Sequence, residues 1–530
     1  MAGVTKWWRD CTRCERLHCG EMLDRRDFLF QSGTLLTALW NLPVPVLAAP
    51  KFGTDPFTLG VASGDPAPDG MVLWTRLAPK PLEGGGMPDA AVPVEWRVAE
   101  DEGMKRVVKK GRTMAVPSLA HSVHVEVAGL KADRWYWYQF RVGKELSPVG
   151  RTRTAPAAGA TPEKLRYAFA SCQHWETGLF TAYDHMAAEN PDLVVHLGDY
   201  IYEGSPRTNG PRRHNSAEIV SLSDYRNRHA LYKTDKSLQR VHALAPWIVT
   251  WDDHEVDNNY AGDVAEDKQT RQELLERRAS AYQAYYEHMP LRASSIPKGS
   301  GMLLYRNIAW GGLANFTVLD TRQYRTDQPC GDGRKAPCAA TYDPAATLLG
   351  ETQHAWMERE LAASRAKWNI VAQQVLLAKI DFKRGEGELM SMDQWSGYEA
   401  CRQRVLRYLH ERRIANPVVI TGDIHSNWAC DLKLDWRDEK SATVGVELVG
   451  TSITSGGDGM DTMKGVEDVY AENPHLKWFG ARRGYVSCLV TPQRTLAEYR
   501  MVPYVSKPGA PVETPRRFTV EAGRPGLVNA

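Results

Sequence analysis

Four short apolar runs in the second part of the chain each end in a group of acidic, thiol, phenol or imidazole side chains. They are LRYAFA before SCQH (171–174), DLVVHL before GDYIY (198–202), PWIVT before WDDHE (251–255) and NPVVI before TGDIH (421–425). Helix-like stretches separate these runs, which favours an α/β layered domain from residue 165 onward. Ligands of such sheets bind on the loops that follow the carboxyl ends of the strands. We therefore expect the four endings to converge on one site.

The side chains at these endings are ligands that suit metal cations. Carboxylate and amide oxygens suit calcium, magnesium or manganese, whereas thiolate, phenolate and imidazole suit iron or zinc. Cys172 and Tyr202 beside Asp199 predict one iron-like position. A neighbouring position is expected from Asp253, Asn258, Asp423 and His425. Asp199, at the tip of its strand, is the expected bridge between two metals.

Each of these motifs also has a structural interpretation. A buried cysteine after a strand is commonly a small hydrophobic residue, and a Gly-Asp pair there is commonly a turn or a helix cap. The acidic loop around Asp253 is also compatible with a solvated surface, and Asp423 with His425 is compatible with a surface hydrogen-bonded pair. Their occurrence in order at four successive strand ends favours the functional interpretation.

The same motifs carry a family resemblance. The order Cys172-Gln173, GDYIY, WDDHE and GDIH resembles the calcineurin-like metallophosphoesterases, and in detail the PhoD-type alkaline phosphatases. The segments PFTLGVASGDP, LDTRQYR and LVGTSITSGG are similar to that family too, so that the resemblance covers nearly all of residues 51–510. It implies a phosphomonoesterase or phosphodiesterase with one ferric ion, Fe(3+), and two calcium ions, Ca(2+). The expected chemistry is in-line attack by a metal-bound hydroxide on the phosphate ester.

The resemblance also implies roles for individual residues. The metal ligands that it implies are Cys172, Asp199, Tyr202, Asp252, Asp253, Asn258, Asp423 and His425. His254 matches the histidine that contacts the phosphoryl group, and it is expected to donate to a phosphoryl oxygen or to protonate the departing alkoxide. Asp199 and Asp253 are expected to take part in catalysis with it.

Two arginines are candidates for binding the phosphate of the substrate. Arg226 and Arg228 lie in the segment DYRNRH, and guanidinium groups can hold charge on phosphoryl oxygens. A solvated helix face explains the same pattern, so both interpretations stay open.

The N-terminus is typical of an export signal. Arg25-Arg26 precedes an apolar stretch that ends in small residues, which resembles a twin-arginine signal with a cleavage site near Ala48 or Ala49. Residues 1–49 are therefore expected to engage the twin-arginine translocase, which would place the mature protein in the periplasm or outside the cell. Polar residues interrupt the apolar stretch, which is shorter than the ~20 residues of a membrane span, so we expect no permanent membrane anchor.

Length and patterning predict two domains. A chain of 530 residues exceeds one ordinary core. Residues 51–155 alternate apolar and polar side chains and contain many valines and aromatics, which predicts a small all-β immunoglobulin- or fibronectin-like sandwich. We expect the α/β metallophosphoesterase domain at 160–510 and a C-terminal tail at 511–530.

Charge and cysteine content restrict the partners and the compartment. The net charge of +2, from 66 basic and 64 acidic residues, provides no global field for nucleic acid or a membrane surface. The expected partners are phosphate mono- or diester substrates, with no nucleic-acid binding required. Cys330 and Cys338 enclose a polar loop and could form a disulfide in an oxidising compartment.

Two alternatives to this function stay open. One is a phospholipase or a teichoic-acid phosphodiesterase, because pocket depth and loops decide which ester binds. The other is a non-catalytic surface protein whose metals only stabilise the fold. A structural metal site would be expected to close every coordination position with protein ligands.

Overall fold

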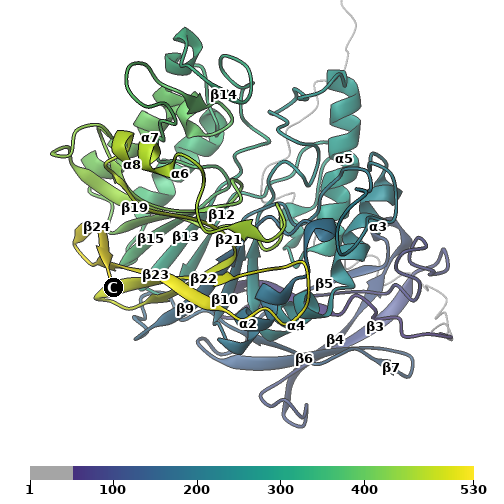
Figure 1. The fold of residues 1–530 in the computed structure, drawn as a ribbon. Helices are drawn as coiled ribbons and strands as arrows, with labels where there is room; N and C mark the ends of the chain where they lie inside the picture. Colours follow the sequence, from purple (N-terminus) through teal and green to yellow (C-terminus); the bar gives the residue numbers. More distant parts are fainter. Residues whose placement is uncertain (1–51) are drawn as a thin grey trace, which may run out of the picture. The chain divides into compact units, whose positions relative to one another are not determined.

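Two large β-sheets run through residues 52–530, the part of the chain that the computed structural model describes (Figure 1). The export signal predicted at 1–49 lies outside the described residues. The first sheet has the order β5, β2, β1, β11, β10, β9, β21, β22, β23, β24. Its strands span Ser122–Val127, Gly70–Arg76, Val61–Ala67, Pro246–Val249, Leu193–His196, Leu165–Ala170, Leu476–Val490, Arg494–Val502, Glu513–Glu521 and Arg524–Asn529.

The second sheet has the order β12, β13, β15, β17, β19, β18, β21. Before β21, its strands span Arg306–Trp310, Ala314–Val318, Trp368–Ala372, Pro417–Thr421, Thr443–Val449 and Asn427–Lys433. The long strand β21 belongs to both sheets, because its first part pairs with β18 and its second part pairs with β9. The two sheets are therefore hydrogen-bonded into one framework.

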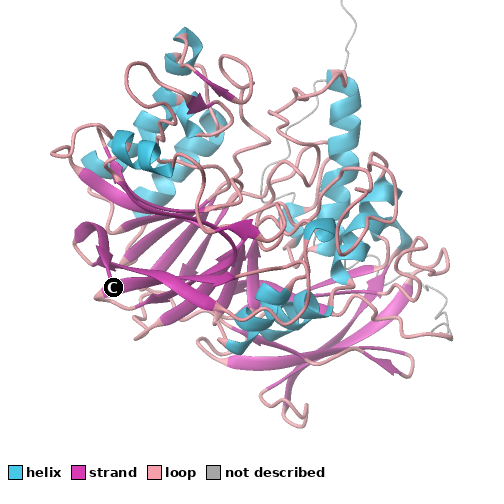
Figure 2. Cartoon of the chain, viewed as in Figure 1, coloured by secondary structure: helices cyan, strands magenta, loops and turns pink. Residues whose placement is uncertain are grey.

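Helices cover the outer faces of both sheets (Figure 2). The first sheet packs against α2, α3, α4 and α5, and the second packs against α6, α7 and α8. These helices span Thr181–Ala188, Leu222–Lys233, Lys236–Leu244, Arg271–His288, Gly350–Ala363, Glu399–Glu411 and Val466–Glu472. A separate apolar core fills the space between the sheets. The central parallel strands are thus buried on both faces, which explains why they are apolar runs without alternation.

Local sequence explains where two of the long helices begin. At the start of α3, the Ser221 hydroxyl accepts a hydrogen bond from the Asp224 amide, and the Asp224 carboxylate accepts one from the Ser221 amide. Thr270 and Glu273 form the same capping box at α5. Each box satisfies amide groups that have no partner within the helix. The starts of α3 and α5 are therefore fixed by side chains that can be recognised in the sequence.

The N-terminal domain is all β, as predicted. Its second layer consists of β4, β3, β6, β7 and β8, which pack on β1, β2 and β5 through a shared apolar core. These strands span Val107–Ala115, Val92–Ala99, Trp135–Val142, Glu145–Leu146 and Gly150–Arg153. Because β1 pairs in parallel with β11, one layer of this sandwich continues into the sheet of the α/β domain. The α/β fold predicted from residue 165 onward is also present.

The C-terminal segment differs from the expected tail at 511–530. Residues 513–521 and 524–529 form β23 and β24, which extend the first sheet beyond β22. Phe518 and Val520 enter the core between the sheets. Strand β23 pairs with β22, and β24 pairs with β23, so both strands belong to the first sheet.

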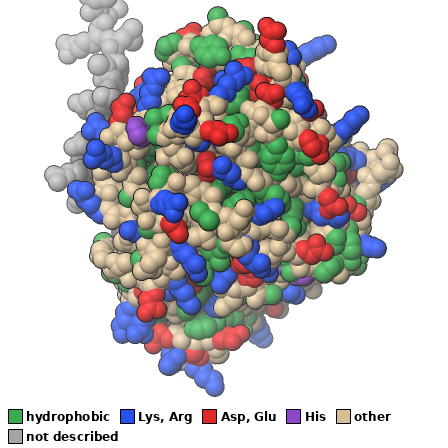
Figure 3. Space-filling view, turned by 60° about the vertical axis from the view of Figure 1, so that its left-hand side comes forward, with side chains coloured by type: hydrophobic (Ala, Val, Ile, Leu, Met, Phe, Trp, Pro, Cys, Tyr) green, Lys and Arg blue, Asp and Glu red, His purple; other side chains and the backbone are tan. Residues whose placement is uncertain are grey.

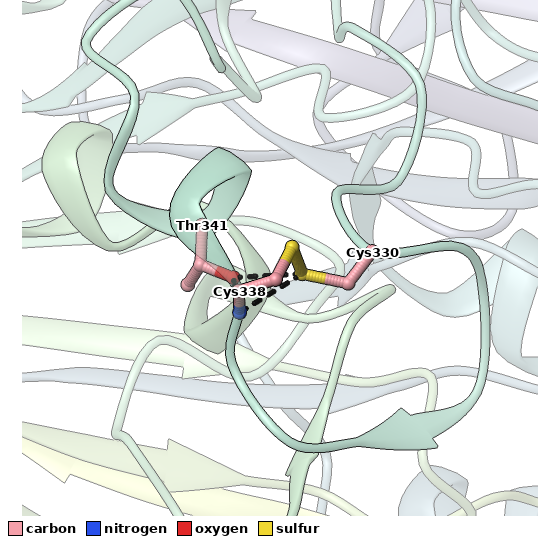
Figure 4. Close-up of a disulfide and its surroundings, with 3 residues drawn as sticks. All are labelled: Cys330, Cys338 and Thr341. Carbon is pink, nitrogen blue, oxygen red and sulfur yellow. Dashed lines mark hydrogen bonds between the residues drawn. A yellow bond between two sulfur atoms is a disulfide. The ribbon is translucent and has the colours of Figure 1, made fainter.

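The predicted disulfide is confirmed. Cys330 and Cys338 are joined, and the amide of Cys338 and the hydroxyl of Thr341 lie 3.1 and 3.2 Å from the Cys330 sulfur (Figure 4). Such a bond persists in oxidising compartments. Cys172, Cys401, Cys430 and Cys488 are reduced and buried.

Surface charge agrees with the small net charge. Figure 3 shows Lys and Arg side chains interspersed with Asp and Glu over the face that it displays. No helix within residues 52–530 combines the length and apolar character that crossing a bilayer would require.

A buried ion pair links the two sheets and yields a stability prediction. Arg306 on β12 donates to both carboxylate oxygens of Asp65 on β1, at 2.8 to 3.1 Å, and Asp65 is 1% exposed. Asp65→Ala leaves this guanidinium unpaired, which should lower the free energy of unfolding by about 3–5 kcal/mol. Glu95→Ala breaks the exposed pair with Arg141 and should cost less than about 1 kcal/mol. Thermal denaturation of the two variants tests this prediction. Equal melting temperatures would contradict the assignment of Asp65 and Arg306 as a stabilising buried ion pair.

Candidate metal centre

The four predicted strand ends converge in the structure. Cys172 follows β9, Asp199 follows β10 and Asp253 follows β11, and these three strands are parallel neighbours in the first sheet. Asp423 and His425 follow β17 of the second sheet and reach the same place. The site therefore lies where the carboxyl ends of strands from both sheets meet.

The candidate ligands form a connected series of three groups. In each group one ligand atom per residue lies within 4.8 Å of the others. The groups are Cys172, Asp199 and His425; Asp199, Asp253 and His254; and Asp252, Asp253 and Asp423. Asp199 belongs to the first two groups and Asp253 to the last two. This sharing fits the bridging position predicted for Asp199 and gives room for more than one cation.

The backbone at these ligands adopts an uncommon conformation. Cys172, Asp199, Asp423 and His425 have φ angles of 57°, 56°, 62° and 53°. Residues other than glycine rarely occupy this left-handed region, and they do so mainly where the surroundings hold them for function. The geometry thus directs side chains of three of the four motifs into one volume at a cost in backbone strain.

Three carboxylate oxygens in this volume have no partner. Asp199 Oδ1, Asp252 Oδ2 and Asp253 Oδ1 are buried without a hydrogen bond within the described residues. Burial, together with neighbouring carboxylates, raises the pKa of Asp199 and Asp252 well above the usual range and that of Asp423 to about 6. Buried carboxylates without donors are costly, and bound cations satisfy them. The residues present therefore fit metal ions.

The softer ligands differ in their readiness to bind a metal. Burial lowers the pKa of His425 to about 3, so its imidazole is neutral and can coordinate. Burial beside Asp199 raises the pKa of the Cys172 thiol, so this side chain would have to lose its proton on binding a cation. The Tyr202 hydroxyl donates to Asp199 Oδ2 at 2.8 Å and lies 3.1 Å from His425 Nε2. Cys172 and Tyr202 lie beside Asp199, and these are the three residues predicted for the iron-like position. His425 groups with them and not with Asp253 and Asp423, where the sequence placed it, and its role as a ligand stays a prediction.

The side chain of Asn258 is held by a neighbouring acid. Its amide nitrogen donates to the carboxylate of Glu266. Asn259, its neighbour, donates its backbone amide to Asp253 Oδ2 at 2.7 Å. The loop thus contacts the site, while the role of Asn258 as a ligand stays a prediction.

His254 is held by Glu203 at the edge of the site. Its Nδ1 atom lies 2.7 Å from Glu203 Oε2, and its ring packs on Tyr202 with centroids 4.1 Å apart. Although burial opposes protonation, the charges of Glu203 and Asp253 raise the pKa of His254 well above its usual value. The side chain is 19% exposed, so it is accessible to a bound ester. The arrangement suits the predicted contact with a phosphoryl or leaving oxygen.

The positions of Arg226 and Arg228 do not support the predicted phosphate contacts. Arg226 forms a two-pronged ion pair with Glu287, at 2.6 and 2.7 Å. Arg228 is fully buried and donates to the carbonyl groups of Tyr202, Gly204 and Ala217. Arg228 therefore positions the loop that carries Tyr202, and neither guanidinium group is directed to the ligand groups.

Arg322 is a residue of the site that the sequence reasoning missed. It follows β13, is completely buried, and its guanidinium nitrogens lie 2.5 Å from Asp252, 3.6 Å from Asp253 and 3.4 Å from Asp423. These are ion-pair distances, so one cation offsets the repulsion among three carboxylates. LDTR follows an apolar strand as the four motifs do, but it lacks the cluster of metal-ligating side chains that marks them.

Glu255 is the second missed residue. Its carboxylate accepts hydrogen bonds from the backbone amides of Asp199, Tyr200 and Asp252, at 3.0, 2.5 and 2.7 Å. It therefore clamps together the loops that follow β10 and β11. The sequence alone does not indicate this clamping role, because Glu255 is one of three acidic residues in the WDDHE motif.

Comparison with known proteins agrees with this site. A family model described as "PhoD-like phosphatase" matches residues 167–499, and one described as "PhoD-like phosphatase, N-terminal domain" matches residues 44–156. The chain is 51% identical over 516 residues to alkaline phosphatase D of Bacillus subtilis (strain 168), covering 95% of this chain and 88% of that protein.

A solved structure is similar over nearly the same extent. The structure titled "Structure of PhoD" superposes with a TM-score of 0.90 at 52% sequence identity, covering 91% of this chain and 93% of that chain. Both domains and the resemblance inferred from the motifs are thereby confirmed. The chain belongs to the PhoD-like phosphatase family.

Proposed function

We propose that this alkaline phosphatase hydrolyses phosphate esters at the metal centre, where the ligand groups joined through Asp199 and Asp253 would hold the cations. The observation that carries the proposal is the series of ligand groups joined through these two residues, together with their unpartnered buried oxygens. A phosphate ester is an anion, so a site made of carboxylates can admit it only when cations are bound. The acidic groups are therefore a metal site and not the surface that meets the substrate.

Different cations suit different parts of the site. Cys172, Tyr202 and His425 around Asp199 offer sulfur, phenolate and imidazole, which favour a ferric ion. Asp252, Asp253 and Asp423 offer oxygen ligands alone, which favour calcium. Bound there, the cations would lower the pKa of a coordinated water and neutralise charge on the phosphoryl oxygens.

The protein's own residues contribute position and charge. Arg322 keeps its guanidinium against Asp252 and Asp423, which limits the repulsion that would otherwise spread these side chains apart. Glu255 keeps Asp199 and Asp252 at a fixed spacing through their backbone amides. Such prior orientation lowers the cost of assembling the reacting groups.

His254 is the proposed donor to the substrate. Glu203 fixes its Nδ1 atom, so that Nε2–H is available to a phosphoryl oxygen or to the departing alkoxide. General acid catalysis of this kind contributes roughly 10²- to 10⁴-fold to a rate. Because His254 also falls in one of the ligand groups, its role as donor and a role as ligand must be separated experimentally.

Monoesters are the substrate class favoured by the similarity to alkaline phosphatase D. Diester hydrolysis, including that of phospholipids or teichoic acid, is the second candidate, since the side chain of His254 is only partly buried. A purely structural metal site is less well supported, because it would not need a positioned cation such as His254.

Export through the twin-arginine pathway is proposed from the sequence of residues 1–49. The disulfide between Cys330 and Cys338 supports a location in an oxidising compartment, the periplasm or the exterior. Folded export would also allow the metals to be installed before translocation.

The proposed ferric site yields a spectroscopic prediction. Phenolate or thiolate bound to Fe(III) absorbs visible light, so the purified protein should be coloured. Tyr202→Phe should shift or bleach the band, whereas Tyr260→Phe, which removes a buried hydroxyl bonded to Tyr282, should leave it unchanged. Absorption spectra with iron analysis make the comparison. An active, colourless wild-type protein without iron would exclude the ferric assignment.

The proposed donor role yields a kinetic prediction. His254→Gln should lower kcat by about 10²-fold or more for an alkyl phosphate while metal content stays at the wild-type value. A smaller loss is expected for p-nitrophenyl phosphate, whose leaving group needs little protonation. Steady-state kinetics on both substrates, with elemental analysis and circular dichroism, separate the roles. Near-normal turnover of both esters would remove His254 from the reaction, and loss of metal would make it a ligand.

A further inference from the structure

A second polar pocket lies between the N-terminal domain and helix α3, apart from the metal centre. Its volume is about 240 Å³, and we call it the Arg76 pocket. The residues that matter to its chemistry are Arg76, Gly84, Gly85, Ser223, Arg226 and Asn227. None of them belongs to the ligand groups of the metal site. The pocket is smaller than the about 300–1,000 Å³ of sites for drug-sized ligands, so it suits a small ion with a few waters.

Arg76 places an unpaired cation at the wall of this pocket. Its side chain is 1% exposed; Nε donates to the Ala120 carbonyl at 2.9 Å and Nη1 donates to His288 Nε2 at 2.8 Å. Nη2 makes no hydrogen bond within residues 52–530, and it lies 3.2 Å from the point that a Cβ atom on Gly85 would occupy. Since Gly85 lines the pocket, this free nitrogen faces it. Burial lowers the pKa of Arg76 to about 10.

The histidine that contacts Arg76 supplies no negative charge. His288 is neutral, because it donates Nδ1–H to the Ala284 carbonyl and burial depresses its pKa well below the usual value. Behind it lie His229, whose ring nitrogens are unpartnered, and Lys233, whose ammonium group packs over Trp74 at 4.4 Å. This interior is basic throughout. A buried guanidinium in such surroundings lacks the counter-charge that it normally requires.

The acidic groups near the pocket are already engaged or exposed. Glu287 is the nearest buried acid, and both of its oxygens are held by Arg226. Asp89 also lines the pocket, but it is exposed at the rim, where solvent screens its charge. The unpaired charge of Arg76 is therefore left for something that enters from solvent.

The opposite wall offers further donors. Ser223 lies in the first turn of α3, where the helix dipole favours an anion. The carboxylate of Asp224 in the same turn is held by the amide and hydroxyl of Ser221. Asn227 accepts from the Gly84 amide at 3.3 Å through Oδ1, which leaves its amide nitrogen to donate. Gly84 and Gly85 have φ angles of 73° and 92°, a conformation that glycine adopts readily and that brings bare backbone against the pocket.

We infer that the Arg76 pocket binds a small tetrahedral oxyanion, and that inorganic phosphate, the product of the phosphatase reaction, is its ligand. Arg76 and Asn227 donate to it from the two walls, and the start of α3 adds favourable charge. The inference does not depend on which metals occupy the catalytic site. It gives the enzyme a product-binding site at the junction of its two domains.

Calorimetric titration of the holoenzyme with inorganic phosphate at constant ionic strength tests this. The wild-type protein should bind two phosphates per chain, one at the metal centre and one at the Arg76 pocket. Asn227→Asp keeps the acceptor for Gly84 but adds a negative charge, and Ser223→Glu adds one at the exposed rim. Each variant should weaken the second event at least tenfold. Asn529→Asp makes the same charge change on the exposed strand β24 and should retain both events.

Kinetics identify which event belongs to which site. The competitive inhibition constant of phosphate reports the metal centre, and it should be the same in Asn227→Asp as in the wild type. A wild-type stoichiometry of one, or two unchanged events in both Asn227→Asp and Ser223→Glu, would overturn the inference. If instead the protein failed to hydrolyse any ester while the Asn227-dependent event persisted, the proposed function would fail and the phosphate site would stand.

Discussion

Repulsion among buried carboxylates is the constraint on which the active site depends. The four aspartates of the site are largely buried. The side chain of Asp423 is 15% exposed, and the other three residues, Asp199, Asp252 and Asp253, are 2% exposed or less. Each of these three contains an oxygen without a hydrogen-bond partner. Removing each such charge from water costs several kcal/mol. Arg322 offsets part of that cost, and its single charge cannot balance four carboxylates. The remaining repulsion is relieved either by protonation, which the raised pKa values of Asp199 and Asp252 favour, or by bound cations. Only cations would leave the carboxylates ionised, so metal binding and the local fold depend on each other.

The layered architecture brings the candidate ligands together. Parallel strands β9, β10 and β11 deliver their loops to one edge, and β21 joins their sheet to the one that carries β17. The apolar core between the sheets therefore sets the distance between ligands from different sheets. Glu255 then fixes the loops to one another through backbone amides, so that the spacing of Asp199 and Asp252 does not rely on the repelling side chains. The strained backbone at Cys172 and Asp423 persists because this framework holds it.

The sequence predicts the features of the fold and of the site that local patterns encode. Apolar runs with chemically similar endings revealed the strands and most of the ligands, because strand polarity alone decides where those endings meet. Arg322 was missed because its partners are 70 and 101 residues away, and a lone arginine after a strand has no local signature. Arg226 and Arg228 are candidates for binding phosphate because a sequence shows that they are charged. It does not show which groups pair with that charge in the fold. The strands at 513–521 and 524–529 were not predicted for a similar reason, since β23 pairs with β22 and β24 pairs with β23, and the local sequence does not reveal these partners.

The central claim is that the carboxylate series exists to hold cations, and metal stoichiometry tests it most directly. Asp199→Asn keeps the size of the side chain and removes the charge shared by two ligand groups, whereas Asp133→Asn changes an exposed aspartate of the N-terminal domain. Elemental analysis of natively produced protein should find more than one tightly bound cation per chain in the wild type and in Asp133→Asn. Asp199→Asn should lose metal while circular dichroism still shows the folded sheets. Active wild-type protein with no stoichiometric metal, or full metal retention in Asp199→Asn, would contradict the account.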